Sequence, residues 1–132
     1  MNVFVDTSAF FALLDRDDQN HVRAKEAWIK LLDSDSLCAT SNYVIVETFA
    51  LLQNRLGLSA VRGFQEDLIP VLLVEWVDTE MHNAAVSSLL AASKRRLSLV
   101  DCSSFEIIRR MSIKSVFAFD PHFREQGFNC MP

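Results

Sequence analysis

Three short apolar runs in this chain each end on a single aspartate, and stretches with helical spacing of apolar residues lie between them. The runs end at Asp6, Asp101 and Asp120. The first and the last are rich in Val and Phe, which is typical of buried strands. Strands that alternate with helices build a parallel sheet that is covered on both faces. We therefore expect an α/β fold of three layers, α/β/α, around a central and mostly parallel sheet of about four or five strands.

The expected elements follow from the spacing of apolar residues and from residues that start or stop helices. Strands are expected at residues 2–5, 37–39, 71–77, 115–119 and 128–131. Helices are expected from Thr7 or Ser8, from Asn20, from Ser41 or Asn42 to Leu56, and over 59–68, 79–93 and 101–111. In a parallel sheet, functional groups gather beyond the carboxyl ends of the strands. Asp6 and Asp120 fall there directly, and an extended segment leads to Asp101.

The chain has the length and composition of one globular domain. It has 132 residues, of which 50% are hydrophobic, and no linker, repeat or low-complexity segment divides it. Such a composition excludes a disordered chain. We expect a single domain over residues 1–132, with a core large enough to support it.

Charge and glycine content exclude several classes of function. The net charge of −4 argues against tight, nonspecific nucleic-acid binding through a basic face. A nucleic-acid substrate is still compatible with this charge, because a metal ion held by acids can reverse the local field. The three glycines are too scattered for a dinucleotide-binding or phosphate-cradling loop.

The cysteine pattern and the apolar segments indicate the cellular environment. The three cysteines, Cys38, Cys102 and Cys130, are widely spaced and have no paired motif. An odd count without a signal peptide predicts reduced thiols in a cytoplasmic protein. Charges interrupt every apolar run before it reaches the length of a membrane span, so we expect no membrane association through such a span.

Four acids stand alone in apolar stretches of the sequence: Asp6, Glu47, Asp101 and Asp120. Asp6 is the only acid in residues 1–14, for example, and most other acids lie in polar turns or helix faces. A carboxylate beside a core is costly unless its charge is compensated. Each of these acids therefore needs an explanation of its own.

Two explanations are open, one structural and one functional. The three aspartates can each cap the helix that follows, and Glu47 can form an ion pair with Arg55 or Arg109. Three capping aspartates would, however, converge at one edge of the sheet, where like charges repel unless a cation lies between them. Mg²⁺ and Mn²⁺ prefer such carboxylate oxygens. The pattern therefore favours a site for Mg²⁺ or Mn²⁺.

Four acids in this order and context resemble the PIN-domain family, and within it the VapC-like toxin ribonucleases of type II toxin–antitoxin systems. The resemblance covers nearly the whole chain. It rests on Val5–Ser8 as the opening motif, on Glu47 as the second acid, on Leu97–Phe105 around the third, and on Phe119–Phe123 around the fourth. There are two departures from the family pattern. Ala118 stands where many members carry Thr or Ser, and Pro121 stands where Arg or another polar residue is usual.

The resemblance implies a Mg²⁺- or Mn²⁺-dependent endoribonuclease that hydrolyses RNA phosphodiester bonds and is the toxin of a toxin–antitoxin pair. Its catalytic residues and metal ligands would be Asp6, Glu47, Asp101 and Asp120. Its partners would be the RNA substrate, a cognate antitoxin and a second copy in a homodimer.

Other polar residues are weaker candidates for the same site. Thr7, Ser8 and Ser103 are candidates to orient water or the scissile phosphate, and Arg95, Arg96 and His122 are candidates to contact the RNA backbone. The plainer interpretation of 94–96 is a basic helix end that interacts with the helix dipole.

Two alternative functions come from other classes. The acids can belong to a catalytically silent binding module that serves only a partner. They can also belong to a phosphoacceptor signalling domain, but that chemistry needs a basic residue at the carboxyl end of a late strand. Lys114 lies before its strand, at the wrong end.

Overall fold

The computed structural model covers residues 1–132 and centres on a five-stranded sheet in the order β3-β2-β1-β4-β5. The strands are β1 (Asn2–Val5), β2 (Leu37–Ser41), β3 (Leu73–Glu75), β4 (Ser115–Phe117) and β5 (Asn129–Met131). All neighbouring strands are parallel. The α/β fold predicted from the sequence is confirmed, and its sheet is entirely parallel.

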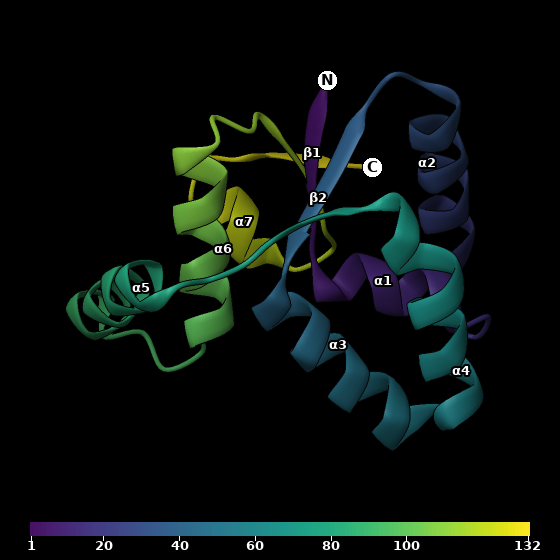
Figure 1. The fold of residues 1–132 in the computed structure, drawn as a ribbon, viewed down its shortest axis with the longest axis horizontal. Helices are drawn as coiled ribbons and strands as arrows, with labels where there is room; N and C mark the ends of the chain where they lie inside the picture. The colour runs from purple at the N-terminus through teal and green to yellow at the C-terminus, as the bar shows by residue number, and fades with distance from the viewer.

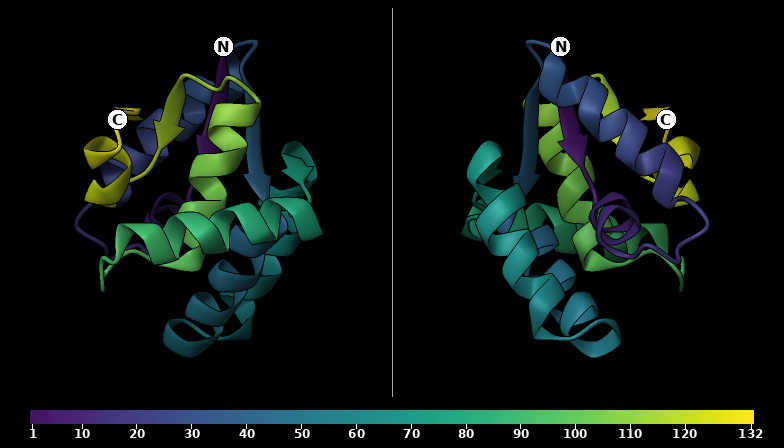
Figure 2. Two further views of the ribbon diagram at one scale, coloured as in Figure 1. Left: turned by 90° about the vertical axis from the view of Figure 1, so that its left-hand side faces the viewer. Right: turned by 90° about the vertical axis from the view of Figure 1, so that its right-hand side faces the viewer.

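Helices cover both faces of this sheet. They are α1 (Thr7–Leu14), α2 (His21–Asp33), α3 (Asn42–Arg55), α4 (Leu58–Gly63), α5 (Thr79–Ala92), α6 (Leu99–Arg110) and α7 (Pro121–Glu125). In Figure 1, α5 and α6 lie on one side of β1 and β2, while α1, α2 and α4 lie on the other. The two side views in Figure 2 show α6 in front of the strands on one face and α2 in front of them on the other. The molecule therefore has the expected three layers.

The central position of β1 follows from its composition. Val3, Phe4 and Val5 are all fully buried, as a strand covered on both faces requires. The next strand in the sheet, β4, is buried along its whole length. The carboxyl ends of these two strands therefore reach the same edge of the sheet and lead to Asp6 and Asp120.

The structure corrects several expected boundaries. The helix expected over 59–68 is divided into α4 and a π-helical turn at Phe64–Leu68. The strand expected over 71–77 is shorter, because a 3-10 turn that contains Pro70 occupies Ile69–Val71. The cap of α5 is Asp78, not Thr79, since Asp78 Oδ1 accepts a hydrogen bond from the backbone N–H of Met81 at 2.9 Å.

The segment before Asp101 also differs from expectation. Helix α5 ends at Ala92, and Ser93 adopts a left-handed conformation with φ of 50°. Residues 94–96 therefore lie in the connection to α6 and not at a helix end. Asp101 lies inside the first turn of α6 and follows no strand. No helix in the structure is both long and apolar enough to span a membrane.

Candidate metal centre

Asp6 follows β1 and caps α1. Its Oδ2 accepts hydrogen bonds from the backbone N–H of Ser8 at 3.1 Å and from the Ser8 hydroxyl at 2.7 Å. The same hydroxyl accepts a hydrogen bond from the N–H of Phe119 at 2.9 Å. Ser8 therefore ties Asp6 to the segment that leads to Asp120. The other carboxylate oxygen of Asp6, Oδ1, makes no hydrogen bond within the protein.

Asp120 and Asp101 also stabilise the starts of helices. Asp120 caps α7, where its Oδ1 accepts a hydrogen bond from the N–H of His122 at 2.9 Å. Asp101 Oδ2 accepts a hydrogen bond from the N–H of Ser98 at 3.2 Å, and the two residues form a capping box for α6. Each aspartate again has one oxygen without a hydrogen bond within the protein. The helix-capping interpretation is therefore correct for Asp6 and Asp120 and wrong for Asp101, because Ser98 is the cap of α6 and Asp101 lies in its first turn. One oxygen of every aspartate is still left for another partner.

Glu47 lies in the middle of α3 and has no structural counterion. Neither Arg55 nor Arg109, the two arginines expected as its partner, lies within ion-pair distance of Glu47. The guanidinium of Arg55 lies over the Phe11 ring, and that of Arg109 lies over Phe128. The ion-pair interpretation of Glu47 is therefore wrong.

The four carboxylates lie within electrostatic reach of one another. Asp6 is 4% exposed, and burial raises its pKa from 3.8 to about 7. Hydrogen bonds from Ser8 oppose this rise, and the charges of Asp101 and Glu47 add to it. Burial also raises the pKa of Glu47, and the charges of Asp101 and Asp120 raise it further. Acids from four separate segments thus share one region.

His122 belongs to the same cluster. Its Nδ1 lies 3.1 Å from Asp101 Oδ2 and 3.3 Å from Asp120 Oδ1. One ligand atom of each of these three residues lies within 4.8 Å of the others. The sequence predicts a contact of His122 with the RNA backbone, but its ring here faces two acids. Its position in the first turn after the Asp120 cap is the sequence signal that relates it to the cluster.

Thr7 and Ser103 are both buried. The hydroxyl of Thr7 donates to the carbonyl of Val44 at 3.5 Å and accepts from Thr48 at 3.1 Å, and its proximity lowers the pKa of Glu47. The hydroxyl of Ser103 donates to the carbonyl of Val100 within its own helix, at 2.7 Å. A role of Ser103 in orienting substrate stays a prediction.

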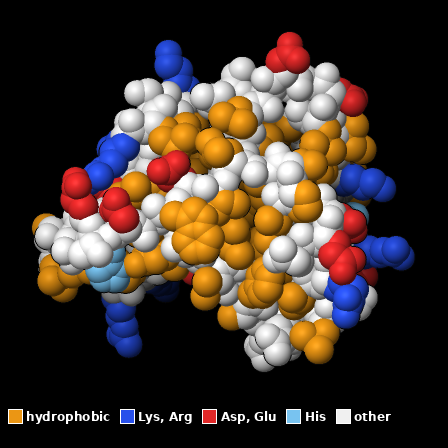
Figure 3. Space-filling view, in the orientation of Figure 1, with side chains coloured by type: hydrophobic (Ala, Val, Ile, Leu, Met, Phe, Trp, Pro, Cys, Tyr) orange, Lys and Arg blue, Asp and Glu red, His pale blue; other side chains and the backbone are white.

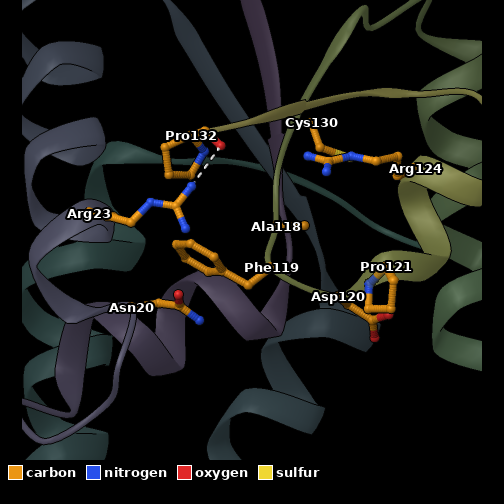
Figure 4. A pocket seen from close by; sticks show the side chains of 9 residues that line it. All are labelled: Asn20, Arg23, Ala118, Phe119, Asp120, Pro121, Arg124, Cys130 and Pro132. Atoms are coloured by element: carbon orange, nitrogen blue, oxygen red, sulfur yellow. Dashed lines mark hydrogen bonds between the residues drawn. The ribbon is translucent and has the colours of Figure 1, made fainter.

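Three cavities meet at Pro121, next to the acids. The central one, of about 440 Å³, is lined by Asp120 and His122 and also by Arg96. A second, of about 320 Å³, is lined by Lys94 and Arg96. The third, of about 250 Å³, lies on the opposite side of Asp120 and is shown in Figure 4. Arg95 lines none of the three.

The donor set fits a hard divalent cation. None of the four acids lies within ion-pair distance of a Lys or Arg. A buried carboxylate without a cationic partner, such as Asp6, is stabilised in its charged form by a nearby cation. Carboxylate oxygens are the ligands that hard divalent cations prefer.

Comparisons with known proteins cover nearly the whole chain. The family model described as the PIN domain matches residues 3–129. The chain is 35% identical over 127 residues to the 23S rRNA-specific endonuclease VapC20 of Mycobacterium tuberculosis, covering 96% of this chain and 95% of that protein.

Two solved structures also match nearly the whole chain. The crystal structure of M. tuberculosis VapC20, described as a Sarcin-Ricin loop cleaving toxin, superposes with a TM-score of 0.84 and covers 96% of this chain and 95% of that one. FitAcB from Neisseria gonorrhoeae gives a TM-score of 0.70 at 13% identity, covering 98% of this chain and 96% of that one. This second similarity supports the fold alone.

Proposed function

The chain belongs to the PIN-domain family, and from that premise we propose that it is a metal-dependent endoribonuclease which hydrolyses RNA phosphodiester bonds. The observation that carries the proposal is the cluster of four carboxylates at one edge of the sheet, none of them paired with a Lys or Arg. The similarity to an rRNA-specific endonuclease over nearly the full length supports RNA as the substrate.

The proposed metal ligands are Asp6, Glu47, Asp101 and Asp120, directly or through water, and the proposed ion is Mg²⁺ or Mn²⁺. When bound, such an ion supplies a water of lowered pKa as nucleophile and neutralises charge at the phosphodiester. Two carboxylates close together repel each other when both are charged, so ion binding also relieves their repulsion. No side chain of the protein needs to act as a nucleophile.

Three residues of the chain position these ligands. Ser8 holds one oxygen of Asp6, so that the other oxygen has a fixed direction. His122 bridges Asp101 and Asp120 and restricts their separation. Thr7 lies close enough to Glu47 to lower the pKa of that carboxyl. We propose that these contacts organise the site before the ion binds, as outer-shell partners of metal sites commonly do.

Basic residues beside the acids are proposed to contact the RNA backbone. Arg96 lines both the central cavity and the cavity that contains Lys94, and His122 lines both as well. Positive charge at this place would attract a phosphate toward the acids in a protein whose net charge is −4. A contribution from Arg95, which is exposed in the same connection, stays part of the proposal.

We also propose that the protein is the toxin of a toxin–antitoxin pair and forms a homodimer. The similarity to a VapC toxin supports the antitoxin partner. Figure 3 shows a broad field of hydrophobic side chains in the middle of one face. Several large hydrophobic residues of α3, of β3 and of the segment after it are exposed, among them Val46, Leu73 and Trp76. Exposed apolar surface of this kind is typical of protein interfaces.

Cleavage of defined RNAs tests the ribonuclease proposal. A hairpin with the sarcin–ricin loop of 23S rRNA, a transfer RNA and a messenger RNA would be incubated with the protein and Mn²⁺. Cleavage of at least one RNA that stops when a chelator is added is the expected result. Mn²⁺ binding without cleavage of any RNA would instead favour the catalytically silent binding module.

The phosphoacceptor alternative gains no support. Lys114 precedes β4 and lies at the amino end of that strand, away from the acids. Incubation with acetyl phosphate is expected to give no stable aspartyl phosphate.

A further inference from the structure

We propose that the cavity between α2 and α7, beside Asp120, binds a phosphate group of the RNA substrate through Arg23 and Arg124. This inference rests on the proposed ribonuclease function and adds to it the path of the RNA strand. Both arginines line the cavity, from elements that lie far apart in the sequence. Neither of them is singled out by the sequence patterns that identify the acids.

The two arginines approach the cavity from opposite sides. Figure 4 shows Arg23 reaching in from α2 and Arg124 from α7, with Ala118 between them. The guanidinium of Arg23 lies 5.7 Å from the centre of the Phe119 ring, which holds it in place, and its Nη2 donates to the carbonyl of Pro132 at 3.3 Å. Most of its five N–H donors are left for a ligand.

No Asp or Glu side chain neutralises this pair of arginines. Neither Arg23 nor Arg124 lies within ion-pair distance of such a side chain, and the one contact of Arg23 with an oxygen is the bond to the main chain of Pro132. The acid in the cavity wall, Asp120, makes its hydrogen bonds with His122, and in Figure 4 its carboxylate points away from both guanidinium groups. Two guanidinium groups that face one cavity without an acidic side chain as partner are suited to an anion, and their planar donors match a phosphate.

The position of the cavity favours a phosphate of the RNA over an acidic side chain of a protein. Asn20, Phe119, Asp120 and Pro121 line both this cavity and the central one over the acids. A ligand here would therefore lie next to Asp120, one of the four proposed metal ligands. At about 250 Å³, the cavity has roughly eight times the volume of one water molecule, which is enough for a phosphodiester group.

The cavity also completes a path across the site. Lys94 and Arg96 line a different cavity, which His122 also lines, and Pro121 lines all three cavities. An RNA strand that crosses Pro121 would place one phosphate at the acids and hold flanking phosphates with the two pairs of basic residues. The substrate would thus be fixed on both sides of the bond that is cut.

RNA affinity and its salt dependence test the inference. A fluorescein-labelled single-stranded RNA would be titrated, by fluorescence anisotropy in the presence of a chelator, with the full-length protein and with R23Q, R124Q and the double variant. The matched control is K25Q, because Lys25 is exposed on α2 and lines none of the cavities. R23K, which retains the charge but lacks the planar fork, is expected to lose only part of the affinity.

The expected result for the double variant is about a tenfold loss of RNA affinity, with the slope of log K against log salt reduced by about 0.7 for one lost phosphate contact. The midpoint of thermal unfolding and the Mn²⁺ affinity should stay those of the wild type. Affinity and salt slope equal to those of K25Q would overturn the inference. Failure of the ribonuclease proposal is distinct from this result, because it would show as a wild-type protein that cleaves no RNA.

Discussion

Carboxylates in two regions of this molecule have opposite surroundings. On the outer face of α5 and α6, Glu80 and Glu106 lie 3.4 and 3.2 Å from the guanidinium of Arg110. At the carboxyl edge of the sheet, Asp6 is buried and Glu47 is partly buried, yet no Lys or Arg lies within ion-pair distance of either. The two acids beside Arg110 are therefore paired, whereas Asp6 and Glu47 are unpaired although burial penalises their charge.

The difference separates acids that form ion pairs within the protein from acids whose charge the fold leaves without a partner. A folded chain avoids buried charges without partners because they reduce its stability. Two of the edge acids, Asp6 and Asp120, cap helices, and Asp101 completes a capping box, which fixes their positions. Their free oxygens and uncompensated charge are what the cation site proposed above requires. The predictions below separate the two regions, from the largest expected effect to the smallest.

The largest effect should come from Asp101→Asn. This change removes one charge from the unpaired cluster, and we expect RNA cleavage to fall on the order of 10³-fold because a metal ligand is lost. Initial rates with a cleavable RNA at saturating Mn²⁺ measure the effect.

Glu106→Gln is the matched control for that variant, because Glu106 lies on the same helix and pairs with Arg110. Its cleavage rate should equal that of the wild type. Equal losses in both variants would remove the distinction between the two regions.

The next effect concerns stability and pH. The metal-free folded protein keeps a proton on Asp6 up to about pH 7, whereas the unfolded chain loses it near 3.8. Stability should therefore fall as pH rises from about 4 to 7 and then level off, and Asp6 contributes at most roughly 4 kcal/mol to this fall. Urea unfolding with a chelator present measures it.

Asp6→Asn removes this contribution, so the free energy of unfolding of the variant should exceed that of the wild type at pH 8. The free energy of unfolding should therefore depend on pH differently in the wild type and in Asp6→Asn. If it changed by the same amount in both proteins between pH 4 and 7, the unpaired state of Asp6 would be contradicted.

A smaller effect is expected for His122→Ala. Loss of the contacts with Asp101 and Asp120 should weaken Mn²⁺ binding by about 10-fold to 100-fold, as for other outer-shell partners of metal sites. Isothermal titration calorimetry measures the affinity. The matched control is His82→Ala, because His82 lies outside the cluster and its ring contacts Tyr43 instead of an acid, so Mn²⁺ affinity should stay unchanged.

The smallest effect belongs to the paired region. Glu80→Gln should change the free energy of unfolding by less than about 1 kcal/mol, because Glu80 is 82% exposed and water screens its contact with Arg110. Chemical unfolding at low and high salt measures this. A larger change would mean that the ion pairs of Arg110 contribute more to the stability of the fold than this comparison of the two regions assumes.

Much of the fold and of the site follows from the sequence. Strands such as β1 are continuous apolar runs, and their alternation with helices determines a parallel sheet. Asp6 and Glu47 stand out because each is the only acid in a long apolar stretch. The family assignment made from the four acids is confirmed by the match over residues 3–129.

Other features depend on contacts that no local pattern encodes. The apolar run before Asp101 looks like a strand end, but Ser98 and Asp101 form a capping box that starts α6 earlier. Arg23 and Arg124 reach one cavity only because α2 and α7 meet the same edge of the sheet. The direction of the His122 ring is likewise set by acids from other segments.

Mn²⁺ binding by wild type and Glu47→Gln tests the central claim most directly. Glu47 caps no helix and pairs with no cation, so replacing it removes charge from the cluster with the least disturbance of the fold. Calorimetric titration should show that the wild type binds Mn²⁺, and that the variant binds it at least about tenfold more weakly while its metal-free form is at least as stable. A wild type that binds no Mn²⁺, or a variant that binds it equally well, would contradict the account.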